Sequence, residues 1–125
     1  MSNKILIAED SSVILNLTKK ILEQELYEID TAKNGQEVLD KLRDKHYDLI
    51  LMDINMPKLN GIECTKRIRS LEDETKSGTP IFAITGNAPN YSKEDFKRAG
   101  INEYLQKPLD FDVLVHAVKN YTNQG

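Results

Sequence analysis

Residues 4–21 read KILIAEDSSVILNLTKKI, and their hydrophobic pattern changes halfway. Residues 5–8 form a short apolar run with β-branched side chains, which is typical of a buried β-strand. After the acidic pair Glu9-Asp10 the apolar side chains recur at helical spacing, on a face formed by Ile14, Leu17 and Ile21. This stretch therefore predicts a strand that passes through an acidic turn into an amphipathic helix.

The same succession of strand and helix occurs four more times along the chain. Further strands are predicted at residues 27–31, 47–52, 80–84 and 101–105. Helix starts are indicated after each of them by capping residues, namely Asn34, Asn60, Ser92 with Asp95, and Asp110. Residues 73–80 are rich in turn formers and are expected to be a loop. Strict alternation favours an α/β fold with a parallel sheet and helices on both of its faces.

The polar content of the strands predicts their order. Strands buried on both faces are continuous apolar runs, as the first, third and fourth strands are. The second strand contains Glu28 and Asp30 and the fifth contains Asn102 and Glu103, so these two belong at the edges. Short right-handed crossovers then favour a doubly wound sheet of order 2-1-3-4-5, in which ligands bind at the carboxyl ends between the first and third strands.

Composition limits the class of protein. The chain has 125 residues and a mass of 14.3 kDa, the size of one domain, so we expect a single domain over residues 1–125 with no output domain. Its one cysteine, Cys64, cannot form an internal disulfide, and a cytoplasmic location is the default expectation. Lys and Arg number 17 against 20 Asp and Glu, a net charge of −3 that does not favour nucleic acid as a direct partner.

Two further features have ordinary interpretations. The basic run Lys66-Arg67-Ile68-Arg69 is expected to be a solvated helix face. The apolar runs are much shorter than the roughly 20 residues that a membrane span needs, and no signal peptide is recognisable, so no membrane partner is expected.

Chemically active side chains follow the predicted strands at one edge of the sheet. Glu9 and Asp10 follow the first strand, Asp53 the third, Thr85 the fourth and Lys107 the fifth. Three neighbouring carboxylates repel one another, so they require a divalent cation or a cationic side chain nearby. Mg²⁺ fits this site because it binds through one or two carboxylates and a phosphate oxygen.

Asp53 is the central carboxylate, and a carboxylate beside a metal can attack phosphorus to give an aspartyl-phosphate. The metal, the Lys107 ammonium and the Thr85 hydroxyl would stabilise the charge that develops on the phosphoryl oxygens. Each residue alone has a simpler interpretation: Asp10 as a helix cap, Thr85 as a turn residue and Lys107 as a solvated lysine. Chance placement of all of them at adjacent strand ends is a poor explanation.

These motifs resemble the receiver domain of two-component response regulators. The resemblance rests on Glu9-Asp10 after an apolar strand, the run from Met52 to Pro57 with Gly61 beyond it, Thr85-Gly86 and Lys107-Pro108, and it covers essentially the whole chain. It implies the flavodoxin-like (βα)5 fold, whose known strand order is the one derived above, so that order is not an independent result.

The resemblance also implies a function. Asp53 would accept a phosphoryl group from a phosphohistidine on a histidine kinase or a histidine phosphotransfer protein, as a signalling domain rather than an enzyme. Glu9, Asp10, Asp53 and the backbone carbonyl of Asn55 would hold Mg²⁺. Lys107 would contact the phosphoryl group, Thr85 would move to hydrogen-bond it, and Tyr104 would be the switch aromatic. The helix after Ser92, the fifth strand and the last helix would form the face that controls binding of an unidentified downstream protein.

Two other functions remain open at this stage. A Mg²⁺-dependent phosphohydrolase could use the same Asp, Thr and Lys, but its general acid two residues after the nucleophile would here be Asn55, which cannot transfer a proton. A flavin carrier could share the architecture. It would need a phosphate-binding loop after the first strand, where Glu9-Asp10 would repel a phosphate.

Overall fold

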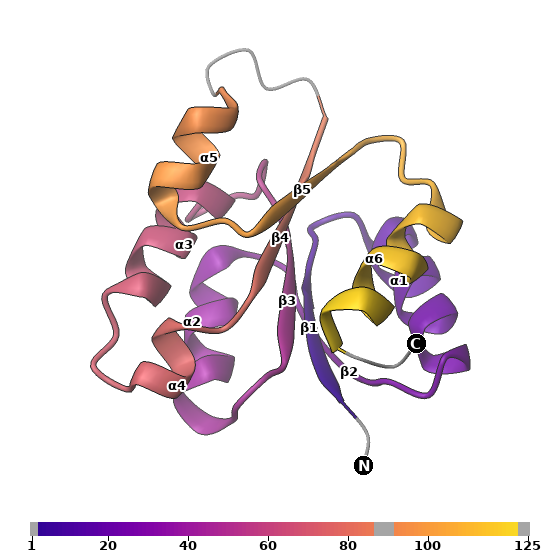
Figure 1. Cartoon of the computed structure of the whole chain (residues 1–125), viewed down its shortest axis with the longest axis horizontal. Coiled ribbons are helices and arrows are strands. Elements are labelled where there is room, and N and C mark those ends of the chain that lie inside the picture. The colour runs from indigo at the N-terminus through magenta and orange to yellow at the C-terminus, as the bar shows by residue number, and fades with distance from the viewer. Residues whose placement is uncertain (1–2, 87–91, 123–125) are drawn as a thin grey trace.

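The structure, a computed structural model, describes residues 3–86 and 92–122 (Figure 1). The elements in this part of the chain are, in order, β1 (Lys4–Ala8), α1 (Ser12–Gln24), β2 (Glu28–Ala32), α2 (Gly35–Asp44), β3 (Leu49–Asp53), α3 (Gly61–Arg69), α4 (Glu74–Ser77), β4 (Ile81–Thr85), α5 (Lys93–Ala99), β5 (Glu103–Gln106) and α6 (Phe111–Thr122). None of these helices has the length and hydrophobicity to cross a membrane.

The five strands form one parallel sheet of order β2-β1-β3-β4-β5, which confirms the predicted order. The strands with polar residues, β2 and β5, lie at the two edges as their composition predicted. Figure 1 shows α1 and α6 on one face of the sheet and α2, α3, α4 and α5 on the other. The chain is therefore a doubly wound α/β domain with the predicted switch point between β1 and β3.

Two hydrophobic clusters hold the helices to the sheet. Alternate residues of the central strands point to opposite faces, so that Leu6 and Ile50 belong to the cluster under α2, α3 and α5. Their neighbours Ile5 and Leu49 belong to the cluster under α1 and α6. All residues of β3 and β4 are buried, which keeps the carboxyl ends of these strands in fixed positions.

All four predicted helix caps are present. The Asn34 and Asn60 side-chain oxygens accept the backbone N–H groups of Glu37 and Glu63, both at 2.9 Å. Ser92 and Asp95 form a reciprocal capping box, and the Asp110 side chain caps α6. At the start of α2 the Glu37 carboxylate also accepts the backbone N–H of Lys33, the residue before the Asn34 cap.

The expectation of a loop over residues 73–80 was wrong in part. Asp73 accepts the backbone N–H of Thr75 and caps the one-turn helix α4. The short helix could not be predicted from the turn-forming residues of this segment, because Asp is favoured both in turns and at helix N-caps. The helix that follows β4 is consequently α5, and the last helix is α6.

The expectation for the basic run of α3 was also wrong in part. Lys66 and Arg67 are exposed, but Arg69 turns inward and is only half-exposed. Its guanidinium donates to the carbonyl oxygens of Gly100, Ser77 and Thr79 and to the Asn102 side chain, at distances of 2.6–3.0 Å. Arg69 thus joins the end of α3 to the segments before β4 and β5, which is a structural role.

Candidate functional site

The turn after β1 positions two carboxylates differently. Glu9 is buried, and its Oε2 accepts the backbone N–H of Ser11 at 3.0 Å. The cap of α1 is Ser11, whose hydroxyl accepts the N–H of Ile14 at 3.4 Å. Asp10 is exposed and does not cap this helix, so the simpler interpretation of Asp10 as the α1 cap is wrong. Its carboxylate is left available at the strand end.

Asp53 is the last residue of β3 and is fully buried. Its Oδ1 accepts two hydrogen bonds, from the backbone N–H of Asn55 at 3.1 Å and from the Lys107 ammonium at 3.2 Å. The Lys107 Nζ is also 3.8 Å from Oε1 of Glu9. Lys107 therefore neutralises part of the charge at the carboxyl ends of β1 and β3.

The three carboxylates form one cluster, called the acidic cluster below. Glu9, Asp10 and Asp53 each offer an oxygen, and these oxygens lie within 4.8 Å of one another. Only one ammonium, that of Lys107, is paired with the cluster in the described part of the chain, so three carboxylates face one cation. This excess of negative charge favours a bound divalent cation.

Two buried oxygens of the acidic cluster have no hydrogen-bond donor among the described residues. These atoms are Oε1 of Glu9 and Oδ2 of Asp53. Burial raises the pKa of Glu9 to about 7; the Ser11 N–H opposes this shift, and the neighbouring Asp53 carboxylate adds to it. Buried carboxylate oxygens without donors are costly unless a cation binds them. The hard oxygen donors fit Mg²⁺, because it prefers oxygen ligands.

Replacing Glu9 by glutamine is expected to stabilise the metal-free protein at pH 8 by on the order of 1 kcal/mol. Because the folded state raises the pKa of Glu9 from 4.5 to about 7, it binds this proton more tightly than the unfolded state. The free energy of unfolding then falls as the pH rises through this window. Urea unfolding in EDTA at pH 5 and pH 8 measures this, and a less stable variant at pH 8 would contradict it.

A backbone hydrogen bond joins Thr85 and Lys107 at the carboxyl ends of β4 and β5. The Lys107 N–H donates to the Thr85 carbonyl oxygen at 2.8 Å, next to the strand pair Thr85 and Gln106. Thr85 is buried, and its hydroxyl donates to the Gly86 carbonyl oxygen at 3.4 Å. Thr85 therefore lies at the predicted strand end, with its hydroxyl in a long hydrogen bond to its own turn.

Tyr104 lies in β5 beside Ala83 of β4, two positions before the partner of Thr85. The alternation of side chains places Tyr104 and Thr85 on the same face of the sheet. The Tyr104 ring is partly buried against Phe96 of α5, with ring centroids 5.9 Å apart. The Lys93 ammonium is 5.6 Å from the centroid of the same ring. Tyr104 thus joins β5 to the helix that follows Thr85.

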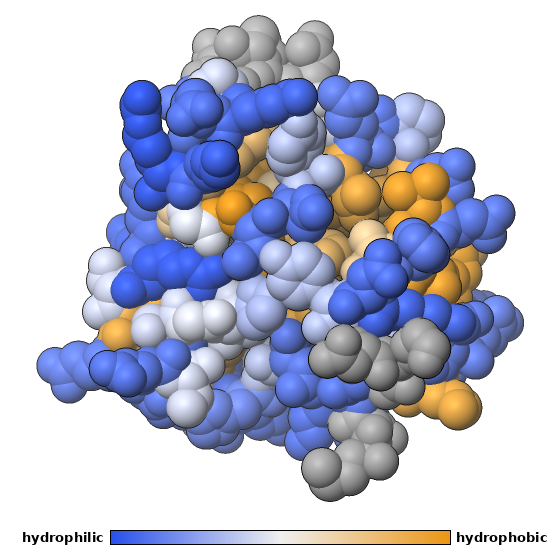
Figure 2. Space-filling model, viewed as in Figure 1, coloured by the Kyte–Doolittle hydropathy of each residue, from blue (hydrophilic) through white to orange (hydrophobic). Residues whose placement is uncertain are grey.

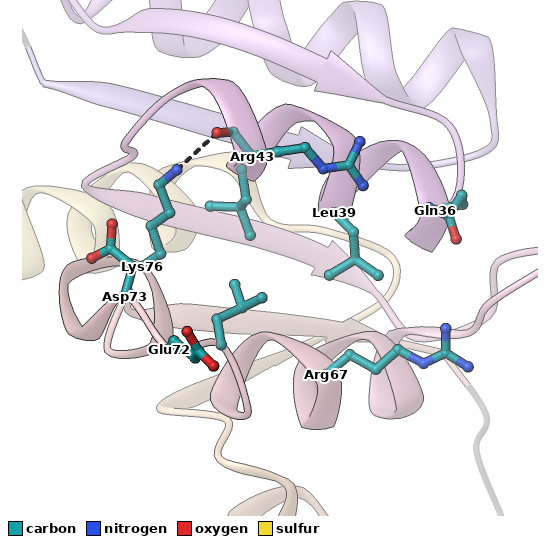
Figure 3. Close-up of a pocket in the computed structure, with 9 residues that line it drawn as sticks. Gln36, Leu39, Arg43, Arg67, Glu72, Asp73 and Lys76 are labelled. Atoms are coloured by element: carbon teal, nitrogen blue, oxygen red, sulfur yellow. Dashed lines mark hydrogen bonds between the residues drawn. The ribbon is translucent and has the colours of Figure 1, made fainter.

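Among the hollows that the described residues form outside the acidic cluster, two have similar volumes. One hollow, of about 470 Å³, lies between α2, α3 and α4. Its lining combines leucine side chains with charged side chains such as Arg43, Arg67 and Lys76 (Figure 3). The other, of about 480 Å³, is called the α1–α6 groove and is lined by Ile14, Leu17, Lys107, Pro108, Leu109 and Phe111. Figure 2 shows apolar residues gathered on the side of the molecule where α1 and α6 lie. This groove shares Lys107 with the site.

A doubly wound domain with an acidic cluster and a lysine at its switch point has the architecture of a signalling receiver. The family model described as the response regulator receiver domain matches residues 5–119. The chain belongs to this family of two-component signalling proteins. Membership favours the receiver over the phosphohydrolase and the flavin carrier.

Curated relatives occur in two contexts. The CAI-1 autoinducer sensor kinase/phosphatase CqsS of Vibrio cholerae is 38% identical over 115 residues, which are 92% of this chain and 17% of that protein. The chain spans 5% and 7% of two hybrid histidine kinases of Dictyostelium discoideum. The polar-differentiation response regulator DivK of Brucella ovis is 32% identical over 121 residues, 97% of both chains.

Solved structures of similar chains have the same fold. The chemotaxis response regulator CheY4 of Vibrio cholerae has a TM-score of 0.87 at 30% identity and covers 97% of this chain and 99% of its own. The receiver domain of the sensor histidine kinase PA1611 from Pseudomonas aeruginosa has a TM-score of 0.86 at 30% identity, covering 97% and 98%. That domain was solved with a magnesium ion coordinated in its active-site cleft.

Proposed function

We propose that this protein is a phosphorylation-controlled signalling switch whose phosphoryl acceptor is Asp53. The donor is a phosphohistidine of a histidine kinase or a histidine phosphotransfer protein. The observation that carries the proposal is the different hydrogen bonding of the two Asp53 carboxylate oxygens. One oxygen is held by Asn55 and Lys107, while Oδ2 is buried without a hydrogen-bond donor among the described residues.

The acceptor chemistry follows from this arrangement. The free Oδ2 of Asp53 forms a bond to phosphorus as the phosphorus–nitrogen bond of the donor breaks and its electron pair returns to the imidazole. The Lys107 ammonium, already beside Asp53, pairs with the charge on the phosphoryl oxygens. The Thr85 hydroxyl exchanges its 3.4 Å bond to Gly86 for one to a phosphoryl oxygen. Later hydrolysis of the aspartyl-phosphate resets the site.

Mg²⁺ is the metal we assign to the acidic cluster. Glu9, Asp10, Asp53 and the backbone carbonyl of Asn55 are its proposed protein ligands and water-mediated partners. When bound, the ion supplies charge compensation at the phosphoryl oxygens. The donorless Oε1 of Glu9 and the three clustered carboxylates support the assignment, as does the magnesium in the PA1611 receiver domain.

Phosphorylation would be transmitted to the face made by α5, β5 and α6. The added group has a charge of about −1.5 to −2 and strong acceptor oxygens, so it can bias a two-state element. The shift of Thr85 toward the phosphoryl group would make room for Tyr104, which lies on the same face of the sheet and packs on α5. The protein then acts by binding a downstream protein, with self-phosphorylation and autodephosphorylation as its only reactions.

The α1–α6 groove is the surface we assign to the phosphodonor protein. It is lined mainly by apolar side chains and includes Lys107, so a protein bound there would reach Asp53. Val13 and Leu17 of α1 and Val113 of α6 are also exposed, which extends the apolar surface. Exposed apolar patches of this kind mark protein-binding surfaces.

Saturating Mg²⁺ is expected to stabilise the wild-type protein, by about 1.4 kcal/mol when its concentration is ten times the dissociation constant. The Asp10→Asn variant should lose most of this stabilisation, because Asp10 offers a ligand oxygen but does not cap α1. Urea unfolding with Mg²⁺ and with EDTA measures both effects. Asp112→Asn, an exposed change in α6, is the control and should behave like the wild type. An equal effect of Mg²⁺ on Asp10→Asn and the wild type would count against the metal assignment.

The function itself is tested by transfer from a phosphorylated histidine kinase or phosphotransfer domain to this protein. We expect Mg²⁺-dependent transfer to an acid-stable, base-labile acyl phosphate. Transfer that is unaffected by EDTA, or the absence of transfer from every donor and from acetyl phosphate, would refute the proposal.

A further inference from the structure

The start of α2 touches the loop that follows Asp53. Gly35 is the first residue of α2 and packs against Leu59, near the end of the loop of residues 54–60. A Cβ atom on Gly35 would lie 2.9 Å from Cβ of Leu59 and even closer to the Leu59 carbonyl oxygen. Real Cβ atoms do not approach backbone this closely, so any side chain at this position would push the loop away.

The α2 side of this contact is held firmly. Asn34 accepts the N–H of Glu37 at 2.9 Å, and Glu37 in turn accepts the N–H of Lys33 at 3.0 Å. In addition, the thiol of Cys64 in α3 donates to the Gly35 carbonyl oxygen at 3.5 Å. Because the first turn of α2 is fixed in this way, a clash at Gly35 would displace the loop rather than the helix.

The loop is short and closed, so a displacement at its end reaches its beginning. The Gly61 N–H donates to the Ile54 carbonyl at 3.0 Å and ties the two ends of the loop together. Within the loop, the Leu59 N–H donates to the Pro57 carbonyl at 2.7 Å. At its start, the Asn55 N–H donates to Oδ1 of Asp53 at 3.1 Å. Leu59 and the acceptor carboxylate thus belong to one compact unit.

We propose that Gly35 is a positioning residue for the metal site, because its bare backbone sets how close the loop of residues 54–60 lies to Asp53. This inference rests on the proposed function in one respect, the role of the Asn55 carbonyl as a Mg²⁺ ligand. Gly35 lies in a different strand–helix unit from Asp53, and the three atoms nearest to a Cβ placed on it all belong to Leu59. It acts only through the position of Leu59.

The test is Gly35→Ala, studied by Mg²⁺ titration with calorimetry and by amide NMR. We expect Mg²⁺ to bind about ten-fold more weakly, the size of effect seen when support of a metal ligand is lost. In the metal-free protein the amide resonances of Asn55 and Leu59 should move, which reports the loop without any activity. Val38→Ala, a buried change in the same helix, controls for lost stability and should keep wild-type Mg²⁺ affinity.

A second variant decides the matter if Gly35→Ala does not fold. Asn34→Ala removes the cap that fixes the start of α2 and should weaken Mg²⁺ binding several-fold. Ser92→Ala removes the corresponding cap of α5 and should leave Mg²⁺ binding unchanged. Unchanged Mg²⁺ affinity in folded Gly35→Ala, or in Asn34→Ala where the first variant fails, overturns the inference. Failure of the wild-type protein to bind Mg²⁺ would instead overturn the proposed function.

Discussion

Replacing Asp53 by asparagine is expected to abolish phosphoryl uptake from acetyl phosphate while the protein remains folded. The amide can still accept the Asn55 N–H and the Lys107 ammonium, but it provides no carboxylate oxygen to form an acyl phosphate. Intact-mass spectrometry of wild type and variant, incubated with acetyl phosphate and Mg²⁺, measures the loss. Far-ultraviolet circular dichroism confirms that the variant is folded.

Asp112→Asn is the matched control, because it makes the same chemical change on the exposed start of α6. This variant should take up as much phosphate as the wild type. Undiminished uptake by Asp53→Asn would show that another side chain is the acceptor, and the proposed mechanism would then be wrong.

Replacing Gly61 by alanine is expected to lower the free energy of unfolding by about 2–3 kcal/mol. A Cβ atom at this position would lie 2.6 Å from the Asp53 carbonyl oxygen and 2.9 Å from Cα of Ile54. Asp53 is the last residue of β3 and Ile54 follows it directly; both residues are fully buried, so their backbone has no room to move. Urea unfolding in EDTA measures the loss, so that metal binding does not contribute.

Gly86→Ala is the control for this change. A Cβ atom there would meet only Cδ of Lys107, at an ordinary contact distance of 3.7 Å. Its free energy of unfolding should stay within about 0.5 kcal/mol of the wild type. Equal stability of Gly61→Ala and Gly86→Ala would show that the backbone around Asp53 is less constrained than its burial indicates.

The fold could be predicted from the sequence because its signals are local and repeated. The strand predicted at residues 47–52, which the structure places at Leu49–Asp53, is apolar from Leu49 to Met52, and such a run favours a central strand. Polar residues such as Glu28 in β2 and Glu103 in β5 identified the edges, and the sheet order confirmed them. Once the order was known, the carboxyl ends of β1 and β3 had to meet.

The finer geometry depends on contacts that no local pattern specifies. Asp10 and Ser11 are both good helix caps, and the structure uses Ser11, which leaves Asp10 available to the acidic cluster. Arg69 is part of a basic run, yet its acceptors come from segments 8 to 33 residues away. In the sequence, Gly35 is simply the residue after the Asn34 helix cap, and only its close contact with Leu59 in the structure indicates a further role.

The most direct test of the central claim is to map the phosphoryl group after transfer from a phosphohistidine donor. Borohydride reduces an aspartyl-phosphate to homoserine, which tandem mass spectrometry locates in the peptide sequence. We predict homoserine at residue 53 when Mg²⁺ is present and none when EDTA replaces it. Homoserine at another aspartate, or at residue 53 regardless of the metal, would contradict the role assigned to Asp53 and the acidic cluster.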